Sequence, residues 1–179
     1  MKYYKILLLL TALIALGACG KDKEADYITS QEKTIDSYWA TRDDNVYEKT
    51  IVEDIYRIVL EQGDKTKAIE KGDIVSFYYK GAILSGKGLE LANIFDTNIA
   101  DIAKQLGLSS ASELEICENV VGKGYFISGL EKGLLQMHKG ETAEIIFTSS
   151  YGYGDKAMNI IPKYSPIIFE VKIEDVKKP

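Results

Sequence analysis

Few residue types and spacings in this 179-residue chain could support covalent or metal chemistry. The chain contains one histidine, His138, and two cysteines, Cys19 and Cys117. A metal site usually takes three or four protein ligands, so the sequence predicts none. Ser128 has no base in a recognisable motif, and its spacing to Glu131 predicts a helix cap instead of a nucleophile. Acyl transfer and metal-assisted hydrolysis are therefore not expected.

The first eighteen residues have the pattern of an export signal. Lys2 and Lys5 precede an apolar run over residues 6–16, and small residues follow before Cys19. This charged, apolar, small-residue order is that of a secretory signal. The apolar run is about half the length of roughly 20 residues that a membrane-spanning helix needs. A signal peptide over residues 1–18 is therefore favoured over a permanent transmembrane anchor.

Cys19 ends the segment Leu-Gly-Ala-Cys, which resembles the bacterial lipobox. The resemblance implies cleavage before Cys19 and lipid attachment to its thiol, and the alternative is an ordinary signal peptide with a coincidental cysteine. Acyl chains anchor a protein by burying CH₂ groups at about 0.8 kcal/mol each. A lipid-modified Cys19 leaves Cys117 without a disulfide partner. The expected location is the cell envelope, in an outer membrane facing the periplasm or the surface if the cell is Gram-negative.

Composition and charge limit the remaining possibilities. With 46% hydrophobic and 27% charged residues, the chain suits one globular core with appendages. The net charge of −5 becomes −7 when residues 1–18 are removed, because they hold two lysines and no acidic residue. A chain this acidic is a poor binder of nucleic acid.

A short extension precedes the predicted domain at residues 50–179. Residues 19–49 are expected to form a lipidated tether and a short helix. The helix is predicted over residues 28–39, where apolar side chains recur at roughly helical spacing: Ile28, Ile35, Tyr38 and Trp39. Trp39 either packs against the domain or docks a partner.

Alternating apolar residues predict β-strands in the domain. The apolar faces are Tyr56, Ile58 and Leu60; Val75, Phe77, Tyr79 and Ile83; Ala143, Ile145 and Phe147; and Ile167, Phe169, Val171 and Ile173. Such alternation is typical of sheets with one packed face and one solvated face. With only short helices between the strands, the pattern predicts an α+β antiparallel architecture.

Two short helices interrupt the strands. The first is predicted over residues 98–107, capped by Asn98 and ended by Gly107. The second is predicted to start with Ser128 as its cap and to bury Leu130, Leu134 and Met137.

Several motifs occur in the order typical of the FKBP family of peptidyl-prolyl cis-trans isomerases, which the chain resembles over about residues 54–176. They are GDIVSFYYKG at 72–81, FDT at 95–97, ISGLEKG at 127–133, YGYG at 151–154, IIP at 160–162 and IIFEV at 167–171. The resemblance implies an antiparallel sheet of five or six strands wrapped around one short helix, with a proline pocket between them. It also indicates an insertion at about residues 98–120.

The resemblance implies a set of site residues and needs no cofactor. The catalytic residues would be Asp96, Tyr153 and Ile127, and the substrate-binding residues would be Tyr79, Phe95, Phe126, Leu130, Ile161 and Phe169. Taken singly, each aromatic residue is better explained by core packing, whereas the ordered set with Asp96 favours a site; for Asp96 the alternative is a role in the turn after Phe95. A buried aspartate needs a partner, and the Tyr153 hydroxyl is the expected one.

The expected function is isomerisation of X-Pro bonds in exported proteins, assisting folding in the cell envelope. Two features favour an alternative, a non-catalytic chaperone that binds proline peptides: Leu130 replaces the tryptophan of well-studied members, and the insertion adjoins the pocket. A second alternative is an envelope interaction module that docks through the Trp39 region. The expected partners are proline-containing polypeptides, the membrane and an envelope protein.

Overall fold

The computed structural model describes residues 23–44, 46–107 and 115–179. The predicted signal peptide at 1–18, Cys19 and part of the predicted insertion lie outside the described residues. Within the described ranges, no helix is long and apolar enough to cross a membrane.

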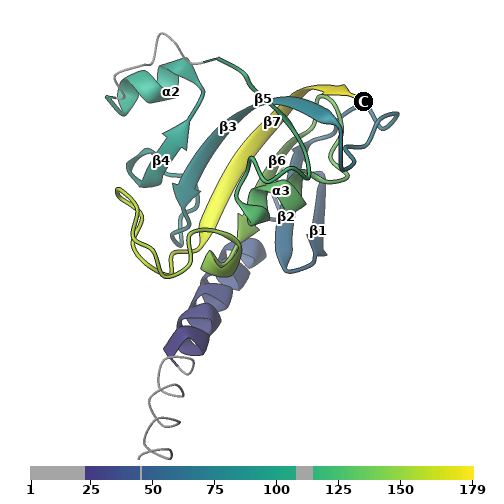
Figure 1. Cartoon of the computed structure of the whole chain (residues 1–179). Helices are drawn as coiled ribbons and strands as arrows, with labels where there is room; N and C mark the ends of the chain where they lie inside the picture. Colours follow the sequence, from purple (N-terminus) through teal and green to yellow (C-terminus); the bar gives the residue numbers. More distant parts are fainter. Residues whose placement is uncertain (1–22, 45, 108–114) are drawn as a thin grey trace, which may run out of the picture.

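An antiparallel sheet of seven strands forms the body of the molecule (Figure 1). Six strands follow the order β1-β2-β6-β7-β3-β4, and β5 pairs with β3. The strands are β1 Glu48–Val52, β2 Ile55–Glu61, β3 Ile74–Ile83, β4 Ile94–Thr97, β5 Cys117–Val120, β6 Thr142–Phe147 and β7 Ile167–Lys177. The predicted antiparallel α+β class is confirmed, with more strands than the five or six expected.

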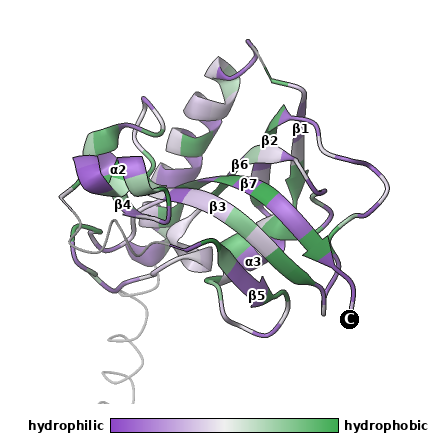
Figure 2. Ribbon diagram, turned by 90° about the horizontal axis from the view of Figure 1, so that it is seen from above, coloured by the Kyte–Doolittle hydropathy of each residue, from purple (hydrophilic) through white to green (hydrophobic). Residues whose placement is uncertain are grey.

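Helices lie on both sides of this sheet. They are an N-terminal helix over residues 23–41, α2 Ala100–Gln105 and α3 Ser128–Leu134, with 3-10 turns η1 Leu91–Asn93 and η2 Ser149–Tyr151. Seen from above, the N-terminal helix and α3 flank the strands on opposite sides (Figure 2). The N-terminal helix extends beyond the predicted range of residues 28–39.

Both faces of the central strands are buried. On the α3 side, the core contains residues predicted to face inward: Val75, Phe77, Ala143, Ile145, Phe147, Ile167, Phe169, Val171 and Ile173. On the other side, Ile35 and Tyr38 of the N-terminal helix pack with Ile58, Ile146 and Ile168. The prediction of one solvated face is therefore wrong for these strands, because the N-terminal helix covers it. In β2, Val59 also belongs to the α3 side, where the sequence pattern had placed an outward residue.

The predicted cap of α3 is wrong. The N-cap residue is Ile127, which makes no side-chain cap hydrogen bond. Ser128 Oγ instead donates to the Tyr151 carbonyl at 3.1 Å. Glu131 accepts from the amides of Gly122 and Gly124, so a tertiary contact has replaced the local capping box. The helix also ends before Met137, which is nevertheless fully buried.

The predicted cap of α2 is also wrong. Asn98 lies before the helix and is buried, and Ile99 occupies the N-cap position. The Asn98 side chain accepts from the Tyr79 amide at 2.7 Å and donates to the Phe77 carbonyl at 3.0 Å. It therefore ties the segment after β4 to the middle of β3. Gly107 follows the helix with a φ of 69°, as expected for its end.

Candidate active site

A cavity of about 250 Å³ opens between α3 and the sheet. Its walls are mostly aromatic or aliphatic, and Asp96 is the charged side chain among them. The lining residues are Phe77, Tyr79, Asp96, Cys117, Asn119, Tyr125, Phe126, Ile127, Leu130, Tyr153 and Phe169. The chain thus builds a small pocket in which aromatic side chains and several polar groups converge, as they do in a small-ligand site.

Seven of the nine predicted site residues line this cavity, and two do not. Phe95 is not among the lining residues, although its ring lies edge-on to Tyr153 at 5.9 Å and to Phe169 at 5.8 Å between ring centroids. Ile161 is 4% exposed and packs in the core. Phe95 therefore packs against two residues that line the pocket and does not line the pocket itself.

Four lining residues were not among the predicted site residues: Phe77, Cys117, Asn119 and Tyr125. Phe77 was assigned only to the core, although its period-two spacing from Tyr79 places both on one face of β3. Cys117 and Asn119 lie in β5, which follows the insertion, so no strand pattern indicated them. Burial raises the pKa of the Cys117 thiol.

The sheet register explains how Phe169 reaches the cavity. Phe169 in β7 lies opposite Gly81 in β3. A Cβ atom on Gly81 would lie 2.6 Å from the Phe169 ring, closer than real Cβ contacts come. Glycine at this position therefore makes room for the ring, which also packs against Tyr79 and Phe147.

Asp96 is held by Tyr79. The Tyr79 hydroxyl donates to Asp96 Oδ2 at 2.9 Å, so the predicted pairing of Asp96 with Tyr153 is wrong. The prediction assumed that Asp96 is buried, but Asp96 is exposed, so water can solvate its carboxylate. Burial first, and the charge of Asp96 second, raise the pKa of both Tyr79 and Tyr153. Both phenols are therefore protonated donors at neutral pH.

Two of the predicted catalytic residues present free donors at the cavity. The Tyr153 hydroxyl makes no hydrogen bond within the described residues, and neither does the Ile127 amide. Ile127 has an extended backbone (φ −59°, ψ 147°), while its carbonyl accepts the Glu131 amide at 3.0 Å. Ile127 is the N-cap residue of α3, so its N–H group lies before the first turn of the helix. Both donors are available to bind a carbonyl oxygen.

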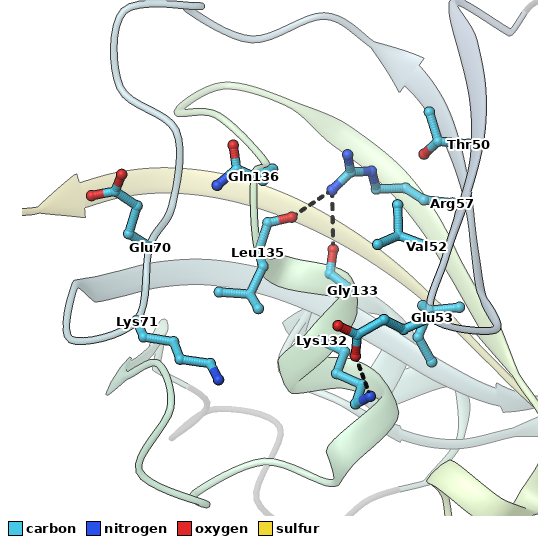
Figure 3. A pocket seen from close by; sticks show the side chains of 11 residues that line it. Thr50, Val52, Glu53, Arg57, Glu70, Lys71, Lys132, Gly133, Leu135 and Gln136 are labelled. Carbon is cyan, nitrogen blue, oxygen red and sulfur yellow. Dashed lines mark hydrogen bonds and ion pairs between the residues drawn. The ribbon is translucent and has the colours of Figure 1, made fainter.

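A larger cavity, of about 340 Å³, has different chemistry (Figure 3). It lies between the β1–β2 hairpin and the end of α3, and none of the predicted site residues lines it. Arg57 donates to the carbonyls of Gly133 and Leu135, which satisfies the C-terminal end of α3. Lys132 pairs with Glu53 on the same wall. No aromatic side chain lines it, so it offers a proline ring no aromatic wall to stack on, unlike the aromatic cavity.

No group of three or more His, Cys, Asp or Glu side chains is placed to hold a metal ion in the described part of the chain. The features on which the site rests are the aromatic walls, one carboxylate and two free donors.

The family model of the FKBP-type peptidyl-prolyl cis-trans isomerases matches residues 65–174. The chain therefore belongs to this family, whose activity is rotation about the bond preceding proline. The match includes α3 and every residue that lines the aromatic cavity.

Similar proteins include two fungal FK506-binding proteins. FK506-binding protein 1 of Aspergillus oryzae is 35% identical over 102 residues, which are 57% of this chain and 81% of that protein. FK506-binding protein 1A of Neurospora crassa is 30% identical over 120 residues, which are 66% of this chain and 85% of that protein. Mouse peptidyl-prolyl cis-trans isomerase FKBP9 is 28% identical over 110 residues, and the chain spans only 16% of its length.

Solved structures share the fold. FkpA from Escherichia coli has a TM-score of 0.59 at 21% identity, covering 97% of this chain and 72% of that one. Wheat FKBP73, with three FKBP domains, has a TM-score of 0.58 at 23% identity, covering 75% and 51%. At these identities the likeness is one of fold.

Proposed function

We propose that the chain catalyses cis-trans isomerisation of X-Pro bonds in exported polypeptides and assists their folding in the cell envelope. The observation that carries this proposal is the aromatic cavity with its two free donors. Its residues come from β3, β4, β5, β7, α3 and the loops before α3 and after η2, so many elements of the fold maintain its shape.

The chemistry needs no nucleophile. An X-Pro bond rotates over a barrier of about 18–20 kcal/mol because the amide loses resonance when it twists. The planar amide is more polar than the twisted one, so a dry aromatic pocket favours the twisted state. In the proposal, Phe126 and Phe169 hold the proline ring, and the Ile127 amide and Tyr153 hydroxyl bind substrate carbonyls.

A protease-coupled assay on a short proline peptide tests this activity. The full chain should accelerate isomerisation, and Tyr153→Phe should lower kcat/KM by about tenfold or more, since it removes one donor and keeps the ring. Tyr47→Phe is the matched control, because Tyr47 is an exposed tyrosine outside the cavity. No rate above background for the unaltered chain would refute the enzyme proposal.

Leu130 supports a second proposal, a binding module with little turnover. It is 5% exposed and lines the cavity, where it offers a smaller platform than an indole ring. This reading expects peptide binding and refolding assistance without acceleration of isomerisation. Under this second proposal, only the Leu130→Trp variant should accelerate isomerisation measurably. Under the catalytic proposal, the unaltered chain should already do so.

We also propose that lipid on Cys19 anchors the protein to a membrane of the cell envelope, with proline-containing polypeptides as clients. The support is the sequence before Cys19. In cells grown with a labelled fatty acid, the wild-type chain should carry label and sediment with membranes, and Cys19→Ala should do neither. An unlabelled wild-type chain would contradict the proposal.

We also propose that an envelope protein partner binds through the N-terminal extension. Trp39 is only part-buried, although its ring meets Tyr56 edge-on at 5.4 Å and the Lys49 ammonium at 4.6 Å. Crosslinking of Trp39→Ala and wild-type chains in cells tests this docking proposal. Loss of a specific crosslinked product would support it, and identical products would refute it.

A further inference from the structure

The loop over residues 149–164 lies between β6 and β7, begins with η2 and carries Tyr153, a wall of the aromatic cavity. Both ends of this loop contact the N-terminal helix, which lies more than a hundred residues earlier in the chain. Figure 1 shows the loop beside that helix. The contacts are made by two helix residues, Gln31 and Tyr27.

Gln31 holds the first residue of the loop with both ends of its amide. Its Oε1 accepts from the Ser149 amide at 2.6 Å, and its Nε2 donates to Ser149 Oγ at 3.0 Å. Gln31 is 4% exposed and Ser149 is 1% exposed, so water does not compete for these bonds. A buried pair of this kind fixes both the position and the orientation of Ser149.

Tyr27 holds the other end. Its ring stacks on that of Tyr164 with centroids 4.5 Å apart and planes within 4°. Tyr164 has a φ of 56°, a conformation that non-glycine residues adopt only when their surroundings stabilise it. The stack supplies one such contact.

The two ends meet at the residue next to Tyr153. The Gly154 amide donates to the Ser149 carbonyl at 2.9 Å, and the Gly154 carbonyl accepts from the Tyr164 amide at 2.8 Å. The Gly152 amide also donates to the Ser149 carbonyl. The backbone around Tyr153 is therefore bonded to the two residues that the N-terminal helix holds.

We propose that Gln31 and Tyr27 are positioning residues for the prolyl site: the N-terminal helix holds loop 149–164 so that Tyr153 closes the cavity. The proposal rests on the proposed isomerase function in assigning a role to Tyr153. It adds a coupling between the extension that leads to the N-terminus and the geometry of the site. Neither residue touches the cavity itself.

Matched substitutions separate positioning from general stability. Gln31→Met keeps the length of the side chain and removes both hydrogen bonds. Tyr27→Ala removes the stack, and Tyr27→Phe retains it, since the Tyr27 hydroxyl has no partner among the described residues. Ser37→Ala is the control on the same helix, because Ser37 is exposed and bonds only to the Lys33 carbonyl.

We would measure kcat/KM and amide hydrogen exchange on full-length chains, at a temperature at which urea titrations show that every variant is folded. For Gln31→Met and Tyr27→Ala, kcat/KM should fall about tenfold, and amide hydrogen exchange at Ser149, Gly152 and Gly154 should accelerate at least tenfold, with exchange in β7 unchanged. Tyr27→Phe and Ser37→Ala should match the unaltered chain in both.

The outcomes are distinct. Unchanged local exchange in Gln31→Met and Tyr27→Ala overturns the proposal that the helix holds the loop. Faster exchange with unchanged kcat/KM overturns the positioning role. If the unaltered chain has no isomerase activity, the proposed function fails, and the exchange data still decide whether the helix holds the loop.

Discussion

Asp96 and Tyr79 form the polar contact at the edge of the aromatic cavity. Because Asp96 is exposed, its orientation depends on the 2.9 Å bond from Tyr79 more than on packing. Both residues line the same cavity. The expectation that a buried aspartate needs a partner nevertheless paired Asp96 with the wrong tyrosine. Tyr79 and Tyr153 both lie near the carboxylate, and sequence order does not tell which hydroxyl comes within bonding distance.

Replacing Tyr79 with phenylalanine should free the Asp96 carboxylate while leaving the aromatic wall intact. We expect kcat/KM to fall several-fold to tenfold, and the free energy of unfolding to fall by about 0.5–1.5 kcal/mol, the usual net contribution of one hydrogen bond. The protease-coupled assay and urea denaturation measure the two effects. Tyr78→Phe on the same strand, whose side chain does not line the cavity, should change neither.

Glu144 is the buried carboxylate on the other side of the sheet. It accepts from the Tyr38 hydroxyl and from Arg42, each at 2.9 Å. Burial raises the pKa of Glu144 above 4.5, although Arg42 and Tyr38 act to lower it. The strand pattern assigned Glu144 to a solvated face, since nothing local indicates that a helix one hundred residues earlier covers it.

The raised pKa of Glu144 predicts a pH dependence of stability. Between pH 4.5 and the raised pKa, the folded state binds more protons than the unfolded chain. The corresponding stability is present in full below pH 4.5 and is lost as the pH rises through the folded pKa. Glu144→Gln removes this titration, so the stability of wild type relative to this variant should decline from pH 4.5 to pH 7 in urea titrations. A constant or rising difference would contradict the assignment.

Among the elements, α3 depends on glycine for its contact with the sheet. A Cβ atom on Gly133 would lie 2.1 Å from Ile145 Cγ2, and one on Gly129 would lie 2.4 Å from the Phe147 ring. The sequence predicted the apolar stripe of this helix from Leu130 and Leu134, which are buried as expected. The caps were not predictable, because the Ser128–Glu131 spacing is a local signal and both side chains found distant partners instead.

Gly133→Ala should therefore destabilise the domain although alanine favours helix. Helix propensity would add up to about 1 kcal/mol of stability, while overpacking against Ile145 costs about 1–3 kcal/mol. We expect a net loss of about 1–2 kcal/mol in the free energy of unfolding, measured with urea. Gly86→Ala is the control, since a Cβ there has nothing within 4 Å and should change stability by less than about 0.5 kcal/mol.

At the scale of the molecule, the N-terminal helix is part of the fold and covers the second face of the sheet. Its existence and its apolar residues Ile35 and Tyr38 were predictable, since the spacing of these residues is helical. Its place was not predictable, because period-two strands with Ile146 and Ile168 on the outer face do not reveal what covers them. Only the assembled sheet defines that surface.

Removing residues 1–41 should consequently destabilise the domain as well as detach it from any anchor. Ile35 and Tyr38 are 0% and 6% exposed, and burying two such side chains contributes roughly 3–6 kcal/mol. The free energy of unfolding of the truncated chain, measured with urea, should be lower by that amount, and Ile58, Ile146 and Ile168 should become accessible to a hydrophobic dye. Ile35→Ala in the full chain should lose about 2–4 kcal/mol, because the same core is left with a cavity. Equal stability of truncated and full chains would mean that the helix only rests on the sheet, and the coupling from Gln31 to Tyr153 would then lose its structural basis.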